Sequence, residues 1–224
     1  MKTIIEVKGI TKSFTDGLVV TQVLKGIDFA AHEGEFIAIM GRSGAGKSTL
    51  LYQMSLLDNP TSGSIKLNGH PVDNLTNSEK TQYRLNELGY VFQDYSLLPE
   101  LTALENIMVP LLMQGVNIQN TKKRAMDVLV GVGLDHRSGN LPSELSGGEQ
   151  QRVSVARAII HKPKILFADE PTANLDSFSS RQVMDIFKKL NKEEGLTIIM
   201  VTHEEEYGRI ADRIVRLSDG QIVK

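Results

Sequence analysis

Short apolar runs recur along the chain at 36–40 (FIAIM), 164–168 (KILFA) and 197–201 (TIIMV). Runs of this length without polar alternation are typical of strands that are buried on both faces. Segments with apolar residues at helical spacing, 121–132 and 177–194, lie between them. Strands that alternate with helices in this way predict a mostly parallel sheet covered by helices on both faces.

The amino-terminal region carries β signals of a different kind, because its apolar runs are short and separated by turn residues. Strands are expected over 4–7, 26–30, 63–67 and 89–92, with hairpin turns at Asn68-Gly69 and Asp219-Gly220. The segments before residue 40 therefore predict short strands that form an antiparallel region beside the parallel sheet.

Helical patterns dominate from about residue 77 to residue 161, between two of the buried strands. Thr102 and Glu105 form a capping box, in which each side chain satisfies a backbone amide at the start of a helix. We expect one domain over 1–224, with its core at about 1–88 and 162–224 and an inserted helical lobe at about 89–161.

The composition narrows the classes of function. The chain has 224 residues, with 25 Lys and Arg against 27 Asp and Glu, so its formal charge is −2. This balance argues against a nucleic-acid partner, which usually requires a basic face. There is no cysteine, which excludes disulfides and thiolate metal sites. The start of the chain lacks a secretory signal pattern, and the longest apolar run in mid-chain, 107–113, is far shorter than the roughly 20 residues of a membrane span.

The strand expected at 36–40 leads into GRSGAGKST, which matches the phosphate-loop pattern G-x-x-x-x-G-K-[ST] at every position. Glycines let consecutive backbone amides point at phosphate oxygens, and the helix that starts near Lys47 adds the positive end of its dipole. Lys47 is expected to reach the β- and γ-phosphates of a nucleotide, and the Ser48 hydroxyl to bind Mg²⁺. The residues of this loop that we expect to contact the nucleotide, which the resemblance below implies is ATP, are Gly41, Arg42, Ser43, Gly44, Ala45, Gly46, Lys47, Ser48 and Thr49.

Two carboxylates end the strand expected at 164–168, in the sequence ILFADE. The carboxyl ends of parallel strands form the edge of the sheet where ligands bind in open α/β folds. Asp169 is placed to hold Mg²⁺, and Glu170 to orient or deprotonate the attacking water. A solvated acidic turn is the alternative when this motif is taken alone.

The predicted fold class is α/β, a phosphate-loop NTPase (RecA-like) with a mostly parallel sheet core, an N-terminal antiparallel β region and an inserted α-helical lobe.

Three further residues are weak signals when each is taken alone. His203 follows the strand at 197–201, where a lone histidine is usually structural or exposed. Gln93 follows the strand at 89–92, and its amide could bind Mg²⁺ or cap a turn. Phe14 could stack on an adenine ring, although an aromatic residue on a strand face belongs more often to the core.

A second glycine pair occurs in LSGGEQQR, residues 145–152. Ser146 and Glu149 form a capping box that should start a helix. Gly147 and Gly148 occupy the first two helical positions, which uncovers the backbone amides. Such a helix start can bind an anion, while an ordinary helix cap is the alternative. One γ-phosphate does not need both the helix start near Lys47 and the helix start at Ser146 from the same chain. A second chain could therefore supply the helix start at Ser146.

In this order the motifs resemble those of the nucleotide-binding subunit of ABC transporters, and the resemblance covers essentially the whole chain. By this resemblance GRSGAGKST is similar to the Walker A motif, Gln93 to the Q-loop glutamine, LSGGEQQR to the family signature, ILFADE to Walker B, Ala173-Asn174-Leu175-Asp176 to the D-loop and His203 to the switch histidine. Two positions depart from the commonest family pattern. Glu149 stands where glutamine is usual, and Phe14 stands where tyrosine is frequent.

The resemblance implies a mechanism and a first partner, a second copy of the chain. Two copies would pack head to tail about a two-fold axis, with each ATP held between Walker A of one chain and 146–148 of the other. The catalytic residues implied are Glu170 as the base, His203 as a contact of the γ-phosphate, and Lys47. The other implied ATP contacts are Phe14, Gln93, Ser146, Gly147, Gly148, Glu149 and Asp176, of which Asp176 would link the two sites. The implied Mg²⁺ ligands are Ser48, Gln93 and Asp169.

The resemblance extends to a branch of the family and to a second partner. Stretches 56–69 and 91–112 are most similar to the ATPases of lipoprotein-releasing and macrolide-export systems, so an integral membrane permease subunit is expected in trans. The family's membrane subunit docks at the stretch after Gln93. The expected location is the cytoplasm, peripheral on the inner face of the cell membrane. Amino-acid importers share much of this pattern, and a regulatory module that signals to a membrane scaffold would use identical motifs. An ATPase acting on DNA or ribosomes is disfavoured by the charge of −2.

Overall fold

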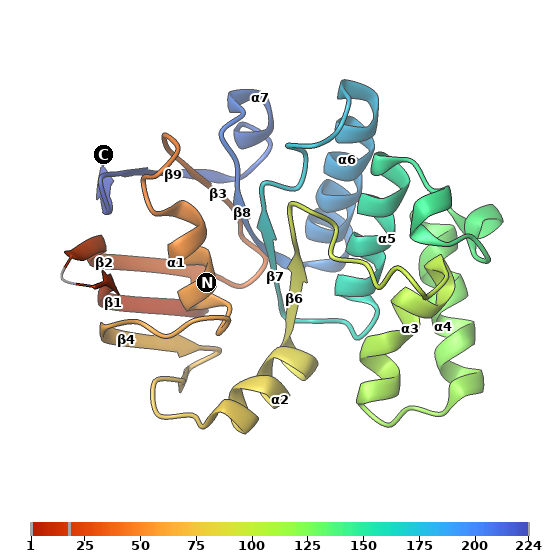
Figure 1. Cartoon of the computed structure of the whole chain (residues 1–224), viewed down its shortest axis with the longest axis horizontal. Coiled ribbons are helices and arrows are strands. Elements are labelled where there is room, and N and C mark those ends of the chain that lie inside the picture. The colour runs from red at the N-terminus through yellow and green to blue at the C-terminus, as the bar shows by residue number, and fades with distance from the viewer. Residues whose placement is uncertain (1, 18, 224) are drawn as a thin grey trace.

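The computed structural model describes residues 2–17 and 19–223, which form two sheets with helices on either side (Figure 1). The larger sheet has six strands in the order β10-β9-β3-β8-β7-β6. Its strands are β3 (Phe36–Met40), β6 (Leu88–Val91), β7 (Ile165–Asp169), β8 (Thr197–Val201), β9 (Arg213–Ser218) and β10 (Gln221–Val223). Every neighbouring pair from β9 to β6 is parallel, and β10 pairs antiparallel with β9. The predicted parallel sheet and closing hairpin are confirmed.

The smaller sheet is antiparallel, in the order β2-β1-β4-β5. It consists of β1 (Thr3–Asp16), β2 (Val19–His32), β4 (Ser62–Leu67) and β5 (His70–Pro71). The predicted antiparallel pairing is confirmed, but the lengths predicted for the strands at 4–7 and 26–30 are wrong, because β1 and β2 are 14 residues each and pair from end to end. Gly9 and Gly26 lie at register shifts inside this ladder, each with a positive φ.

Helices form where apolar spacing and capping residues predict them. They are α1 (Lys47–Met54), α2 (Asn77–Glu87), α3 (Ala103–Met113), α4 (Ile118–Gly131), α5 (Gly147–Ile159), α6 (Ser177–Glu194) and α7 (Glu205–Gly208). The capping boxes predicted at Thr102 and Ser146 are both formed. α4 begins before the predicted residue 121, because the Asn117 side chain accepts a hydrogen bond from the Asn120 amide and caps the helix earlier.

The two faces of the parallel sheet bury alternate side chains of the same strands. On one face, Ile37 and Ile39 of β3 join α1 and the antiparallel sheet in one apolar cluster. On the other face, Phe36, Ala38 and Met40 pack with residues of α5 and α6. Every residue of β3, β7 and β8 is buried. This burial on both faces explains why these runs lack polar alternation.

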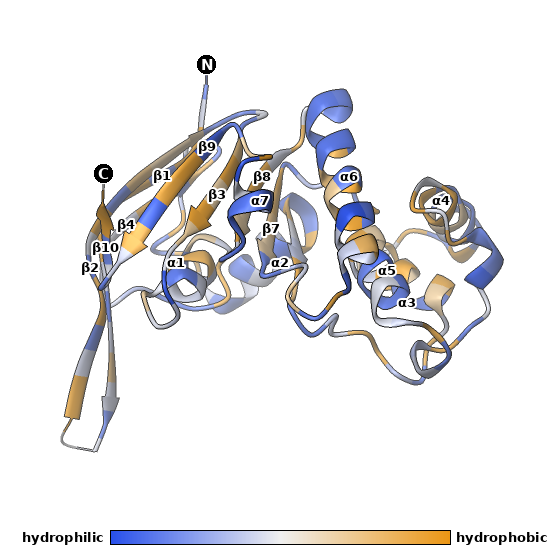
Figure 2. Ribbon diagram, turned by 90° about the horizontal axis from the view of Figure 1, so that it is seen from above, coloured by the Kyte–Doolittle hydropathy of each residue, from blue (hydrophilic) through white to orange (hydrophobic). Residues whose placement is uncertain are grey.

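Helices α3, α4 and part of α5 form a third apolar cluster, on the side of β6 away from the antiparallel sheet (Figures 1 and 2). Val153 of α5 faces this cluster and Val155 faces the sheet, so α5 joins the lobe to the core. We propose that the lobe begins after Val91 rather than at residue 89, because β6 belongs to the parallel sheet. In the described part of the chain, no helix is both long and apolar enough to cross a membrane.

Candidate functional site

The carboxyl ends of the central parallel strands form one edge of the sheet, and four sequence motifs meet there. Gly41 follows β3 and His203 lies just after β8. Asp169 is the last residue of β7, and Gln93 lies just after β6. Because neighbouring strands are parallel and paired in register, these segments leave the sheet side by side. The fold thus gathers residues that are far apart in the sequence.

The loop at 41–49 joins β3 to α1 and curves tightly. Gly46 is the N-cap of α1 with φ 96°, a left-handed conformation, and a β-carbon there would lie 3.0 Å from the Leu24 side chain. Both the conformation and the space therefore favour glycine. Lys47 is 8% exposed, and its Nζ donates to the Arg42 carbonyl at 3.2 Å. The ammonium group is held against the loop whose amides start α1, which is the arrangement of an anion site.

Ser48 and Asp169 meet between α1 and β7. The Ser48 hydroxyl donates to Asp169 Oδ1 at 2.8 Å, and Asp169 is 6% exposed. Burial raises the pKa of the Asp169 carboxyl, and hydrogen bonds from Ser48 and Tyr52 act in the opposite direction. Tyr52 was not among the predicted site residues. Its spacing of four residues from Ser48, on the same side of a helix, is the signal that could have found it.

The oxygen atoms at this junction suit a hard divalent cation. Hydroxyl and carboxylate oxygens are ligands that Mg²⁺ accepts, and this ion usually completes its shell with substrate phosphates and water. Within residues 2–17 and 19–223, no group of three or more His, Cys, Asp or Glu side chains is arranged to hold a metal by itself. A cation at Ser48 and Asp169 would take its remaining ligands from phosphate oxygens and water.

Glu170 connects three of the motifs. It follows β7 with φ 46°, a left-handed conformation that is uncommon for a residue with a side chain. Its Oε2 is 2.6 Å from His203 Nδ1, and its Oε1 is 3.9 Å from Lys47 Nζ. Its amide donates to the Val201 carbonyl at 3.0 Å. The three residues predicted to be catalytic therefore lie together, although they come from three separate segments.

Two side chains anchor residues 93–96, in the segment that follows β6. One is Asn174, which the resemblance assigns to the D-loop, and the other is Arg157, which the sequence did not single out. Asn174 Nδ2 donates to the Gln93 carbonyl at 3.3 Å. Arg157 of α5 donates through Nη1 to the Ser96 carbonyl at 2.7 Å. The members of these pairs are 81 and 61 residues apart, so no local pattern reveals them.

The second glycine pair, Gly147 and Gly148, begins α5, and this helix is capped by Ser146 as predicted. Ser146 Oγ accepts from the Glu149 amide at 3.3 Å, and Glu149 Oε2 accepts from the Ser146 amide at 2.8 Å. Arg137 Nε donates to the other carboxylate oxygen of Glu149 at 3.0 Å. α5 and α1 lie on opposite sides of β6 and β7 (Figures 1 and 2). Among the described residues, no hydrogen bond joins 146–149 to the loop at 41–49, so one chain does not bring its two glycine-rich helix starts together.

Gly148 is buried where α5 packs on the start of α6. A β-carbon there would lie 2.4 Å from Ser179 Oγ and 2.6 Å from Ser179 Cβ. Asp176, the N-cap of α6, holds Ser179 by accepting from its hydroxyl at 2.7 Å, and this hydrogen bond lowers the pKa of Asp176. Close packing is therefore a second reason for glycine at 148. The observed role of Asp176 is that of a helix cap, and its predicted role in linking two nucleotide sites stays a prediction.

Replacing Gly148 with alanine is expected to lower the free energy of unfolding by about 1–3 kcal/mol, the usual cost of adding a carbon to a filled site. Ser179 cannot move aside without giving up its hydrogen bond to Asp176. Urea unfolding followed by circular dichroism measures the change. The matched control is Gly139→Ala, at an exposed glycine where an added β-carbon meets nothing within 4 Å. Equal stabilities of the two variants would contradict the close contact at Gly148.

Phe14 lies near the end of β1 and is 48% exposed. The interpretation of Phe14 as a core aromatic is therefore wrong. Lys12 Nζ lies 5.0 Å from the centroid of its ring. An exposed aromatic ring can stack on a nucleotide base, which is the role that the resemblance implies.

A parallel sheet that presents a complete glycine loop before a helix, and an aspartate and a glutamate at the end of a neighbouring strand, defines a phosphate-loop NTPase. Comparison with known proteins identifies the family within that class. The model of the ABC transporter family matches residues 24–173. The chain belongs to the ABC transporter family.

Similar proteins cover the chain from end to end. It is 46% identical to the lipoprotein-releasing system ATP-binding protein LolD of Geobacter metallireducens, over 100% of this chain and 99% of that protein. It is also 46% identical to the macrolide export ATP-binding/permease protein MacB of Syntrophobacter fumaroxidans, over 98% of this chain but 31% of that protein. A dimeric structure of a post-hydrolysis state of the ATP-binding cassette MJ0796, bound to ADP and Pi, matches with a TM-score of 0.93 at 38% identity, over 99% of this chain and 97% of that one. The chain is thus an ATP-hydrolysing motor subunit of an ABC transporter.

Proposed function

We propose that this chain drives an ABC transporter of the lipoprotein-releasing or macrolide-exporting type, by closing as a homodimer on ATP and reopening after hydrolysis. The names of the relatives LolD and MacB, each 46% identical, favour export or transmission of motion by a separate membrane subunit. The ATPase of an amino-acid importer and a regulatory ATP-binding module are the alternatives. They use the same motifs, so the membrane partner is what distinguishes them.

The separation of the two glycine-rich helix starts is the observation that most supports a homodimer. Each start offers backbone amides to an anion, yet α1 and α5 lie on opposite sides of β6 and β7 in one chain (Figure 1). Two copies packed head to tail about a two-fold axis bring the start of α5 in one chain to the loop at 41–49 in the other. Bound ATP then holds the two chains together, and its hydrolysis removes the contact that keeps the dimer closed. The similar MJ0796 cassette is described as dimeric.

Within each site the side chains have separate roles. Lys47 neutralises charge on the β- and γ-phosphates. Glu170 orients and deprotonates the attacking water, and His203 fixes its carboxylate at 2.6 Å and contacts the γ-phosphate. Asp176 links the two sites through the start of α6. The remaining ATP contacts that we propose are Phe14, Gly41 to Thr49, Gln93, Ser146, Gly147, Gly148 and Glu149.

Mg²⁺ is the cation that we propose beside ATP. Ser48 and Asp169 would hold it, since their oxygens are already adjacent at 2.8 Å, with the Gln93 amide from the neighbouring strand as a further ligand. The ion supplies positive charge that neutralises the transferred phosphoryl group. The burial of Asp169 strengthens this attraction, because charges interact more strongly away from water.

An apolar groove beside the 93–96 segment is the surface that we propose for an integral membrane permease subunit. The groove has a volume of about 390 Å³. Leu57 and Met113 line it and are 42% and 64% exposed, and exposed apolar side chains around a groove favour a protein partner. Arg157 lines it as well and anchors the 93–96 segment, so a partner seated there would act on the loop beside the nucleotide site. Through this partner the chain would lie on the cytoplasmic face of the membrane. We propose no nucleic-acid partner.

Replacing Leu57 and Met113 together with glutamate is expected to abolish recovery of the membrane partner, because two unpaired carboxylates would be buried in the interface. The ATP affinity of the isolated chain should not change, since neither side chain contacts the 41–49 loop. The measurement is co-purification from gently solubilised membranes of the native host, with identification of the recovered proteins. Val130→Glu is the matched control, because Val130 is exposed on α4 and lies outside the groove.

Each outcome of this experiment has a distinct meaning. Recovery of an integral membrane protein with the wild-type chain and Val130→Glu, but not with the groove variant, supports both the transporter class and the groove. Recovery with all three places the partner elsewhere on the surface. If only soluble proteins or ribosomes co-purify with the wild-type chain, the proposal of a membrane partner is wrong.

A further inference from the structure

A lysine on β1 contacts both the Phe14 ring and the segment that follows α1. Lys12 Nζ lies 5.0 Å from the centroid of the ring, within the range of a cation–π interaction. The same Nζ is 2.7 Å from Asp58 Oδ2, and it donates to the Asn59 carbonyl at 2.7 Å. The Lys12 side chain is only 12% exposed. Its ammonium group is therefore held by these contacts rather than left in solvent.

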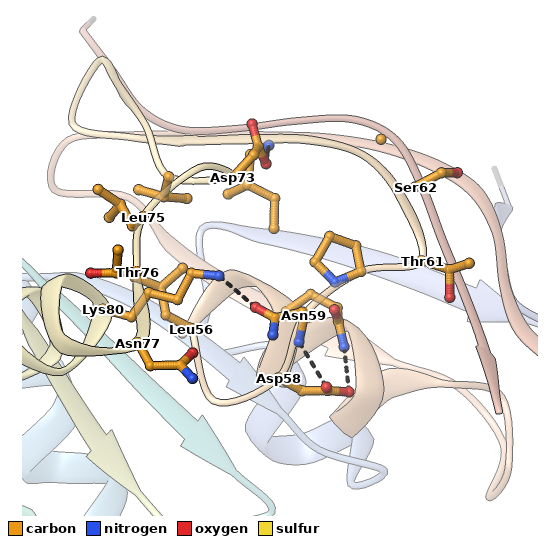
Figure 3. Close-up of a pocket in the computed structure, with 15 residues that line it drawn as sticks. Leu56, Asp58, Asn59, Thr61, Ser62, Asp73, Leu75, Thr76, Asn77 and Lys80 are labelled. Atoms are coloured by element: carbon orange, nitrogen blue, oxygen red, sulfur yellow. Dashed lines mark hydrogen bonds between the residues drawn. The ribbon is translucent and has the colours of Figure 1, made fainter.

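The anchor of Lys12 is tied in turn to α1. Asp58 and Asn59 line a polar pocket of about 520 Å³, and the dashed lines at Asp58 in Figure 3 mark its bonds from Gln53 Nε2 at 3.0 Å and from the Asn59 amide at 2.7 Å. Gln53 is fully buried on α1, the helix that follows the glycine loop. Burial alone would raise the pKa of Asp58, but hydrogen bonds from Lys12 and the Asn59 amide hold it below its usual value. A continuous set of contacts thus runs from α1 to the ring of Phe14.

Few contacts support the part of β1 that carries Phe14. Beyond the end of the β4 ladder, the Ser13 amide donates to Thr61 Oγ1 at 3.0 Å, and Lys12 makes the contacts described above. The ladder between β1 and β4 ends at Thr11 and Ser62. Beyond that point β1 pairs with β2 as far as Asp16 and Val19, and this end of the two strands projects from the body of the protein (Figure 2). A hairpin of two strands is marginally stable by itself. Lys12 is the residue directly after the end of the β4 ladder, so it ties the hairpin down where the third strand stops.

We propose that Lys12 is a positioning residue for the nucleotide base: fixed by Asp58 and Asn59, it holds one face of the Phe14 ring so that the opposite face stacks on the purine of ATP. This inference rests on the stacking role proposed above for Phe14. Aromatic stacking uses the π-face of the base and does not depend on its hydrogen-bonding edge. The base is thereby connected, through Lys12, Asp58 and Gln53, to the same helix that binds the phosphates.

The test compares ATP with inorganic tripolyphosphate, which has phosphates but no base. Lys12→Met keeps the apolar stem of the side chain and removes the charge. It is expected to weaken ATP binding about threefold to tenfold, the range for a partly desolvated cation–π contact. Its affinity for tripolyphosphate should equal that of the wild-type chain, because the 41–49 loop is untouched. Lys12→Arg retains a cation and should restore ATP affinity. Isothermal titration of the full chain with each ligand in the presence of Mg²⁺ gives these values.

Two further variants separate this inference from the proposal on which it rests. Phe14→Ala should weaken ATP binding roughly fivefold or more, the usual effect of losing a stacked aromatic ring, and adding Lys12→Met to it should have no further effect. The double variant with Lys12→Met and Asp58→Asn leaves no unpaired charge, and it should behave as Lys12→Met does. If Phe14→Ala weakens ATP binding but Lys12→Met does not, the role of Lys12 is wrong and stacking stands. If neither variant weakens it, stacking itself is wrong. Equal weakening of ATP and tripolyphosphate by both Lys12 variants would give Lys12 a purely structural role and overturn the inference.

Discussion

Replacing Glu170 with glutamine is expected to lower the rate of ATP hydrolysis about a hundredfold or more, while ATP affinity stays close to that of the wild-type chain. Glutamine has nearly the shape of glutamate but cannot take a proton from the attacking water. Lys47 and the 41–49 loop, which bind the phosphates, are unchanged. Because hydrolysis is the step that reopens the proposed dimer, the variant should accumulate as an ATP-bound dimer at saturating Mg-ATP. Phosphate release measures the rate, and sedimentation measures the dimer.

Glu206→Gln provides the matched control for this variant. Glu206 is an exposed residue of α7, so the same chemical change there should alter neither turnover nor association. A Glu170→Gln chain that hydrolyses ATP at the wild-type rate would assign the base to another group. A chain that stays monomeric at saturating Mg-ATP would remove the main support for the dimer of the isolated protein.

A second large effect is expected from Gly147→Asp. In the proposed dimer this carboxylate would face the γ-phosphate bound by the other chain, and like charges at such a contact cost several kcal/mol, so turnover should fall by about a hundredfold or more. The added β-carbon would lie 2.7 Å from the Tyr95 hydroxyl, which is the end of a side chain that can move aside. ATP affinity measured on separate chains, at concentrations too low for association, should be close to that of wild type. Turnover and affinity are measured on the same preparation.

Gly147→Asn separates charge from bulk, because asparagine has the same shape as aspartate without the charge. The asparagine variant should lose much less activity than the aspartate variant. An equal loss in both would assign the effect to crowding against Tyr95. If Gly147→Asp weakens ATP binding by separate chains, the start of α5 contacts the nucleotide of its own chain, and the proposed geometry is wrong.

The parallel core and the motifs at its edge could be predicted from the sequence because local patterns specify them. The helix over 177–194 and the strands over 36–40 and 197–201 have the predicted bounds. Capping boxes are equally local, since their two side chains are three residues apart. The place of Glu170 at the edge of the sheet followed from one further rule, that parallel strands present their carboxyl ends at the same edge. The role of His203 was implied by the family resemblance, because a lone histidine after a strand is a weak signal.

The remaining features depend on contacts between distant segments, which no local pattern encodes. The strands expected at 4–7 and 26–30 belong to one long hairpin, whose pairing continues past Gly9 and Gly26 as register shifts. The exposure of Phe14 also depends on the tertiary arrangement, since its part of β1 extends beyond the end of the β4 ladder. The packing of Gly148 on Ser179 likewise depends on how α5 lies against α6.

The central claim is that each ATP is bound by the 41–49 loop of one chain and the start of α5 of another. The most direct test is the ATPase rate of a one-to-one mixture of Lys47→Ala and Gly147→Asp chains, each of which should be inactive alone. In a mixed dimer one site combines both damaged elements, and the other combines the intact loop of one chain with the intact α5 start of the other. The mixture should therefore recover about a quarter of the wild-type rate, since half of the dimers are mixed and half of their sites are intact. A mixture as inactive as its separate components would contradict the shared site.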